Sequence, residues 1–142
     1  MNISLFIMAK LLSATFSMLY ANYFILAFCL LYAIIQVDLN LIESIFIALS
    51  LMLTFLHHYL TIRVKFDSDL LLMLYEQFNT KQADQDELTQ QFDMTLVSLG
   101  LMPKEKMNRN WDLRFKGCFK LLKIQIIVLT LQMTLFFALL TV

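Results

Sequence analysis

Three long runs of apolar residues dominate the pattern of hydrophobic and polar positions along the chain. They extend from Leu11 to Gln36, from Leu41 to about Ile62, and from Ile124 to Val142. An α-helix rises about 1.5 Å per residue, so about 20 apolar residues cross a hydrocarbon core of roughly 30 Å. The pattern therefore predicts an all-α integral membrane protein with three transmembrane helices.

The first two apolar runs are separated only by the short segment 37–40. Asn40 is followed three residues later by Glu43, a spacing typical of the capped N-terminus of a helix. The first run is longer than the roughly 7–15 apolar residues of a signal peptide and ends without a small-residue cleavage pattern. We therefore expect residues 1–63 to form a retained transmembrane hairpin, with residues 2–9 either extending its first helix or lying along the interface.

Two amphipathic helices are predicted between the second and third runs, in residues 64–110. Apolar side chains recur at helical spacing over 66–79 and again over 85–99, which places each set on one face of a helix. Asp84 stands where an N-cap is expected, and Gly100 where the second helix should end. We expect a helical hairpin outside the membrane, with apolar stripes formed by Phe66, Leu70, Leu74, Phe78, Leu88 and Phe92.

The last segment, 111–142, has no Gly or Pro after Gly117, so one helix is predicted to run from Trp111 into the third span at 124–142. Trp111 is expected to anchor this helix at the membrane surface, where Trp rings concentrate. The first part of the helix is basic, with Arg114, Lys116 and Lys120 largely off its apolar face.

Charge is unevenly distributed outside the spans. Between Phe66 and Pro103, seven acidic residues and one basic residue give a net charge of −6, whereas between Lys104 and Lys123 seven basic and two acidic residues give +5. Basic residues beside a span attract anionic headgroups, so our first interpretation of the basic stretch is an ordinary membrane flank. The alternative is that the acidic hairpin folds onto the basic stretch, in the same chain or a neighbour, and competes there with lipid.

The same charges predict an orientation. All eleven Lys and Arg residues lie before the first span or between the second and third. By the positive-inside rule, the N-terminus and residues 64–122 are then cytoplasmic, while the turn at 37–40 and the C-terminus lie outside. We therefore expect a multi-pass protein of the plasma (inner) membrane, in contact with anionic headgroups of the bilayer.

Composition agrees with a membrane protein. Hydrophobic residues make up 60% of the chain and charged residues 15%, compared with nearly half and about a quarter in soluble domains. Cys29 lies in an apolar run and Cys118 in the basic stretch, so neither a disulfide nor a zinc site is expected.

Few polar side chains interrupt the spans. His57 and His58 are adjacent, so on a helix they diverge by about 100° and suit a shared metal ion poorly. For them we favour interfacial packing, with a pH-sensing or proton-relay role as the alternative. Small and amide side chains at helical spacing on the first span are expected to pack inside the bundle rather than in a homodimer: Ser13, Ser17, Ala21 and Asn22.

No motif for catalysis stands out in the sequence. We find no glycine-rich phosphate loop, no GxSxG nucleophile and no paired-cysteine metal motif, and we expect no cofactor. The basic residues flank a span and lack a nucleic-acid-binding fold, so no nucleic-acid partner is expected. A third interpretation, an enzyme acting on lipid headgroups through Asp67 and Asp69, would need a metal or cofactor.

We therefore expect a small non-enzymatic accessory, assembly or scaffold protein that presents the hairpin to a protein partner or to its own copies. The alternative is an oligomeric small transporter, channel or lipid-handling protein with a polar path of Asn22, His57, His58 and Arg63. In the first case the partner or lipid contacts would be the hairpin stripes, the exit of the second span and the start of the last helix: Arg63, Phe66, Leu70, Leu74, Phe78, Leu88, Phe92, Trp111, Arg114, Lys116 and Lys120.

Overall fold

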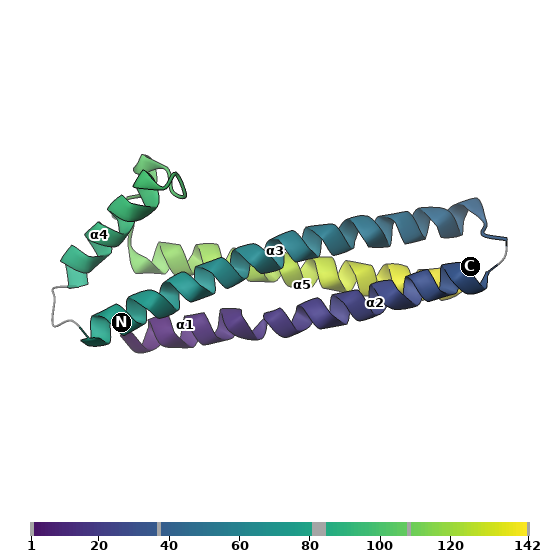
Figure 1. Cartoon of the computed structure of the whole chain (residues 1–142), viewed down its shortest axis with the longest axis horizontal. Coiled ribbons are helices and arrows are strands. Elements are labelled where there is room, and N and C mark those ends of the chain that lie inside the picture. Colours follow the sequence, from purple (N-terminus) through teal and green to yellow (C-terminus); the bar gives the residue numbers. More distant parts are fainter. Residues whose placement is uncertain (1, 37, 81–84, 108, 142) are drawn as a thin grey trace.

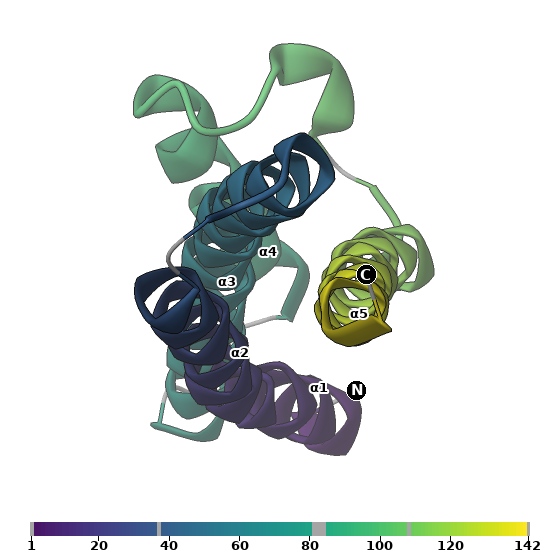
Figure 2. The same ribbon diagram turned by 90° about the vertical axis from the view of Figure 1, so that its right-hand side faces the viewer.

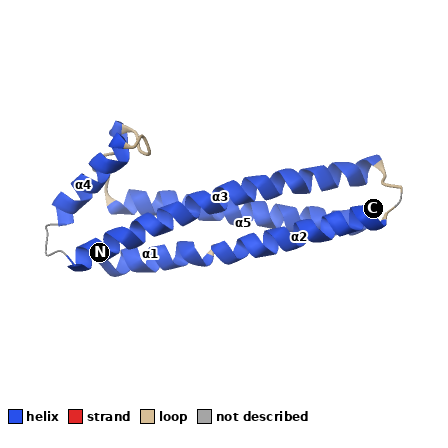
Figure 3. Cartoon of the chain, viewed as in Figure 1, coloured by secondary structure: helices blue, strands red, loops and turns tan. Residues whose placement is uncertain are grey.

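The computed structural model describes residues 2–36, 38–80, 85–107 and 109–141. Every element in this part of the chain is helical, which confirms the all-α expectation (Figure 3). The elements are α1 (Asn2–Ala14), α2 (Phe16–Ile35), α3 (Leu41–Thr80), α4 (Gln85–Ser98), the short 3₁₀ helix η1 (Lys104–Lys106) and α5 (Trp111–Thr141).

The long helices form an elongated bundle. α1 and α2 follow one another along one side, and α3 packs against both of them and against α5 (Figures 1 and 2). The N-terminus and α4 lie at one end of the bundle, while the α2–α3 turn and the C-terminus lie at the other (Figure 1). In the described part of the chain, three helical stretches are long and apolar enough to cross a membrane: Ile3–Ile35, Leu41–Thr80 and Trp111–Thr141.

Residues 2–9 continue the first helix, which settles one alternative left open by the sequence. The helix is interrupted only at Thr15, where both the backbone N–H and the side-chain hydroxyl donate to the Leu12 carbonyl, at 3.2 and 2.6 Å. A hydroxyl that bonds back to the preceding turn competes with the regular helical pattern and bends the helix. α1 and α2 therefore meet at a slight break rather than forming one straight rod.

α3 runs without a break through residue 63, where the sequence analysis placed the end of the first domain. The helix expected over 66–79 is therefore the second half of α3. No Gly or Pro lies between residues 41 and 80, so nothing in the local sequence ends the helix. With 40 residues, α3 is about 60 Å long, roughly twice the thickness of the hydrocarbon core. Its second half extends beyond the apolar span.

The end of the bundle near α4 has its own apolar core. It joins α1, the second half of α3 and α4 through a cluster that includes Leu12, Leu71, Leu74, Phe78 and Leu88. Leu74 is 1% exposed, and Phe78 and Leu88 are also buried. These three stripe residues were expected to contact a partner, and the structure corrects this: they are already covered by the chain's own helices.

A glycine ends α4 as predicted. Gly100 has a φ of +69°, its N–H donates to the Val97 carbonyl at 3.0 Å, and the N–H of Leu101 donates to the Leu96 carbonyl at 2.9 Å. This pair of bonds is the Schellman motif, which favours glycine because other residues are strained at positive φ. The N-cap expected at Asp84 lies outside the described residues.

The small-residue stripe on the first span faces outward, which corrects the expectation that it packs inside the bundle. Ser13, Ser17 and Ala21 are all exposed, and the two hydroxyls donate to carbonyls three residues earlier in the chain, of Lys10 and Ala14. The inward face of α1 and α2 carries larger side chains instead. Helical periodicity placed these small residues on a common face, but it could not decide which way that face points.

The capping pair at the α2–α3 turn forms in part. A Glu43 carboxylate oxygen accepts from the Asn40 backbone N–H at 2.7 Å, and the other accepts from the Tyr32 hydroxyl at 2.8 Å. Glu43 therefore ties the start of α3 to the end of α2, and it is only 8% exposed. Its negative charge also lies at the positive end of the helix dipole.

Replacing Glu43 by alanine is expected to lower the free energy of unfolding by about 1–2 kcal/mol, because a cap and a hydroxyl bond are lost together. Thermal unfolding of the purified protein in detergent measures this change. Asp38→Ala is the matched control, since it removes an exposed acid from the same turn. Equal losses in the two variants would show that Glu43 contributes only charge to the turn.

Candidate functional site

Polar side chains line the inside of the bundle, within its apolar helical stretches. On α3 they recur every third or fourth residue, which keeps them on one face of the helix, and they meet one amide from α2 and two from α5. None of these side chains is more than 4% exposed. We name this set the polar seam: Asn22, Ser50, Thr54, His57, Thr61, Gln125 and Gln132.

Two glutamines join α5 to α3 within the seam. The Nε2 group of Gln125 donates to the Thr61 hydroxyl at 3.0 Å, and that of Gln132 donates to the Thr54 hydroxyl at 3.0 Å. Each threonine hydroxyl in turn donates to a carbonyl of its own helix, at 2.8 Å for Thr61 and 2.9 Å for Thr54. Hydrogen bonds of this kind hold helices together in membranes.

Other polar atoms of the seam are buried without a partner among the described residues. These are both side-chain atoms of the Asn22 amide, Nε2 of His57, and the Oε1 atoms of Gln125 and Gln132. All four side chains are 0% exposed. Each unsatisfied group costs about 1–3 kcal/mol, and ordered water satisfies such groups in other proteins. The seam therefore has unused hydrogen-bonding capacity at several positions along its length.

A small cavity reaches the seam from the end near α4. Its volume is about 200 Å³, and it lies between the α1–α2 break and α3, with Thr15 and Thr61 in its wall and Lys65 and Asp69 beside them. Thr61 belongs to the seam, so the cavity brings charged residues beyond the apolar span next to one end of the seam.

An apolar layer closes the other end of the seam. Ile25, Cys29 and Leu139 form a buried cluster there, and the Ser50 hydroxyl lies 3.6 Å from the Cys29 sulfur. Beyond this layer lie Glu43 and Tyr32 at the α2–α3 turn. Polar groups are thus present on both sides of a short apolar constriction.

The structure separates the two adjacent histidines. His57 is fully buried in the seam, and the interfacial position expected for it stays a prediction. His58 is half-buried on the neighbouring face, where its Nδ1 lies 2.8 Å from the Tyr23 hydroxyl. Arg63 is exposed, with its guanidinium 3.5 Å from the Tyr59 hydroxyl. Of the four residues of the expected polar path, only Asn22 and His57 lie inside the bundle.

Five members of the seam were not identified from the sequence: Ser50, Thr54, Thr61, Gln125 and Gln132. Thr54 and Thr61 flank His57 at helical spacing, and Gln125 and Gln132 lie two helical turns apart on the third span. This shared spacing is the signal that could have identified them. A single Thr or Gln in an apolar run does not by itself indicate a site. These residues become informative only when several of them are seen to share one face of a helix.

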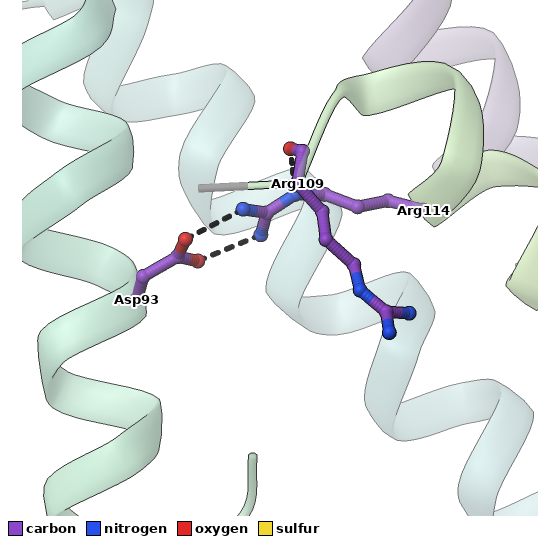
Figure 4. Close-up of polar contacts among 3 residues, drawn as sticks. All are labelled: Asp93, Arg109 and Arg114. Carbon is purple, nitrogen blue, oxygen red and sulfur yellow. Dashed lines mark hydrogen bonds and ion pairs between the residues drawn. The ribbon is translucent and has the colours of Figure 1, made fainter. Parts of the chain in front are cut away.

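A buried ion pair, separate from the polar seam, joins α4 to α5. Asp93 accepts two hydrogen bonds from the Arg114 guanidinium, at 2.7 and 2.6 Å (Figure 4). The Arg114 Nε also donates to the Arg109 carbonyl at 3.1 Å, and its guanidinium lies 4.9 Å from the centre of the Trp111 ring. Asp93 is 0% exposed and the Arg114 side chain 14%. Acidic α4 therefore does dock on basic α5, through Arg114, while Lys116 is exposed.

Beneath this ion pair lies a cavity of about 610 Å³ between α3, α4 and α5. Burial raises the pKa of the Asp67 carboxyl in its wall, and the nearby Arg63 guanidinium opposes that rise. Burial also raises the pKa of the Cys118 thiol to about 11, so this thiol is protonated near neutral pH. Both Cys118 and Cys29 are free thiols.

Comparisons with known proteins leave the site to be interpreted from its own geometry. No protein-family model, no curated protein and no solved structure matches this chain. Among the described residues, no group of three or more His, Cys, Asp and Glu side chains is placed to hold a metal ion.

Proposed function

We propose that the chain is a small integral membrane protein that conducts protons across the bilayer through water held along the polar seam. The observation that carries this proposal is the set of buried polar atoms without partners on Asn22, His57, Gln125 and Gln132. Polar residues inside a membrane are costly and are therefore suspected of function.

Helix packing alone is a weaker explanation for these residues. An interhelical hydrogen bond in a membrane stabilises by only about 0.6 kcal/mol on average, whereas an unsatisfied buried carbonyl costs about 1–3 kcal/mol. Gln125 donates once from Nε2, and Gln132 donates to the Thr54 hydroxyl and, at 3.5 Å, to the Asn22 carbonyl. Each leaves its Oε1 acceptor unpaired among the described residues. An apolar side chain of similar size would pack as well without that cost, so packing does not account for the choice of glutamine.

The chemistry of the seam suits protons. Water and hydroxyl groups donate and accept hydrogen bonds at the same oxygen, so a proton can pass along a chain of them, and the amides would hold the water in place. The His57 imidazole can accept a proton on one ring nitrogen and release one from the other. The cavity lined by Lys65 and Asp69 supplies the mouth at one end, and the Ile25–Cys29–Leu139 layer forms a constriction that must be wetted for conduction.

The membrane and the orientation are part of the proposal. The basic residues around Arg63 and along the start of α5 support a plasma (inner) membrane location with α4 and the N-terminus in the cytoplasm. The mouth beside Asp69 would then face the cytoplasm and the α2–α3 turn the outside. We propose no enzymatic activity and no cofactor.

An accessory or scaffold role is the second candidate. What favours it is a groove of about 430 Å³ between α3 and α4, beside which Phe66 is 44% exposed. Because Leu74, Phe78 and Leu88 are buried within the chain, the contact surface for a protein partner or a second copy would shift to Phe66, Leu70 and Phe92.

Proton flux into proteoliposomes separates the two candidates. We expect a membrane potential set by potassium and valinomycin to drive protons into vesicles that contain the protein and not into empty ones. The double variant Gln125→Met/Gln132→Met should lose this flux, because it removes the polar atoms that hold water. Its unfolding midpoint should stay close to that of the wild type, since the lost hydrogen bonds are offset to within about 1 kcal/mol by removal of the unpaired carbonyls.

A structural role for the seam gives the opposite result. If the glutamines serve only to hold α5 against α3, the wild type should conduct no protons, and the double variant should lose about 0.6 kcal/mol of stability for each interhelical hydrogen bond. Thr130→Val on the exposed face of α5 is the matched control. It also removes a polar group from the third span, but outside the seam.

A further inference from the structure

The cavity between α3, α4 and α5 lies where two helices leave the apolar spans. Its wall contains Arg63, which directly follows the second apolar run, and Ile124, which begins the third. In a bilayer, this position lies at the level of the lipid headgroups. Lipids are therefore the molecules present at highest concentration at its mouth.

The wall combines positive charge with apolar surface. Arg63, Lys106 and Lys120 line the cavity, all three are exposed, and none of them forms an ion pair with another described residue. Arg114 also lines it, but its guanidinium is held by Asp93. The remaining wall is mainly apolar and includes Leu70 and Leu121, on the two helices that continue into the membrane.

We propose that this cavity binds an anionic phospholipid from the adjoining leaflet. The phosphate would lie between Arg63 on α3 and Lys120 on α5, with Lys106 closing over it, since a guanidinium matches phosphate oxygens and an ammonium adds charge. The upper part of an acyl chain would lie against Leu70 and Leu121 and continue along the spans. A volume of about 610 Å³ is sufficient for a headgroup with its glycerol.

The Asp93–Arg114 ion pair positions one wall of the site. It holds α4 over the cavity, so Phe92 and Leu96 of α4 face Leu70 and Leu71 of α3 across it. The hypothesis that hairpin and lipid compete for one basic surface is thereby modified. Asp93 of α4 binds Arg114, and the other basic residues of the cavity remain to bind the lipid phosphate.

Among the described residues that line the cavity, Asp67 is the one acid, and its replacement gives a direct test of the proposal. A carboxylate there repels a phosphate, so its replacement by a neutral amide should strengthen binding of anionic lipid. The burial that raises the pKa of this carboxyl acts in the same direction, because protonation removes the repelling charge.

The test measures which lipids the full-length protein retains. The protein is reconstituted in nanodiscs of mixed phosphatidylglycerol and phosphatidylcholine, released into mild detergent, and analysed by native mass spectrometry. We expect retained lipid to be enriched in phosphatidylglycerol. Arg63→Gln/Lys120→Gln should reduce this enrichment at least about fivefold, and Asp67→Asn should increase it. The matched control Lys116→Gln removes an exposed base of the same helix outside the cavity and should leave the enrichment unchanged.

The other outcomes contradict the proposal in distinct ways. An equal loss with Lys116→Gln would mean a diffuse surface charge and no site. If Asp67→Asn does not increase the phosphatidylglycerol enrichment, the lipid binds elsewhere. An increase cannot result from misfolding of the variant, because misfolding would destroy the site. Displacement of the lipid by millimolar glycerol phosphate would mean that the cavity takes a soluble anion. None of these variants alters a residue of the polar seam, so the result is independent of proton flux.

Discussion

Replacing Asp93 by asparagine is expected to release α4 from α5. Asp93 is fully buried and receives two short hydrogen bonds from Arg114, so the variant leaves a guanidinium without its counter-charge. Removing one partner of a buried ion pair costs about 3–5 kcal/mol. Arg114 is partly exposed, so we expect about 3 kcal/mol, at the lower end of that range.

Hydrogen–deuterium exchange measures this release helix by helix. Amides of α4 should exchange about 100-fold faster in Asp93→Asn, while those of the spans on α2, α3 and α5 should keep their protection. Glu87→Gln is the matched control, because it neutralises an exposed acid of the same helix. Unchanged exchange in Asp93→Asn would mean that the apolar contacts of Leu88 and Phe92 hold α4 without the ion pair.

Replacing His57 by leucine is expected to abolish proton flux, whereas the same change at His58 should leave it intact. The two residues are neighbours in the sequence and lie at nearly the same level along α3. Only His57 lies in the seam, with a buried Nε2 that has no partner among the described residues, while His58 bonds to Tyr23 on another face. If proton flux is lost only in the His57 variant, the cause is the change inside the bundle. Loss of any histidine at this level of α3 would affect both variants.

A second substitution at position 57 tests whether the imidazole itself carries the proton. His57→Gln keeps a polar side chain that can bind water but cannot take up a proton near neutral pH. If His57 relays protons, this variant should be as inactive as His57→Leu. If the imidazole only supports a column of water, flux should persist. Equal activity of His57→Leu and the wild type would contradict the proton path altogether.

Local sequence determines the helices and their ends. Three apolar runs, the scarcity of Gly and Pro, the Asn40–Glu43 spacing and Gly100 were enough to predict three spans, a capped turn and the end of α4. These features act within a few residues, so they can be recognised in a linear sequence. The continuity of α3 through residue 63 follows from the same logic, because no residue between 41 and 80 terminates a helix.

Tertiary structure decides which face of each helix points inward. In a soluble protein, hydrophobic residues mark the buried face, but in a membrane the lipid-facing side is as apolar as the core. The sequence therefore could not tell that His57 lies inside and His58 outside, or that Ser13 and Ser17 face outward. It also could not assign Arg114 rather than Lys116 to the contact with α4. Those distinctions arise only when α2, α3 and α5 pack together, and they define the polar seam.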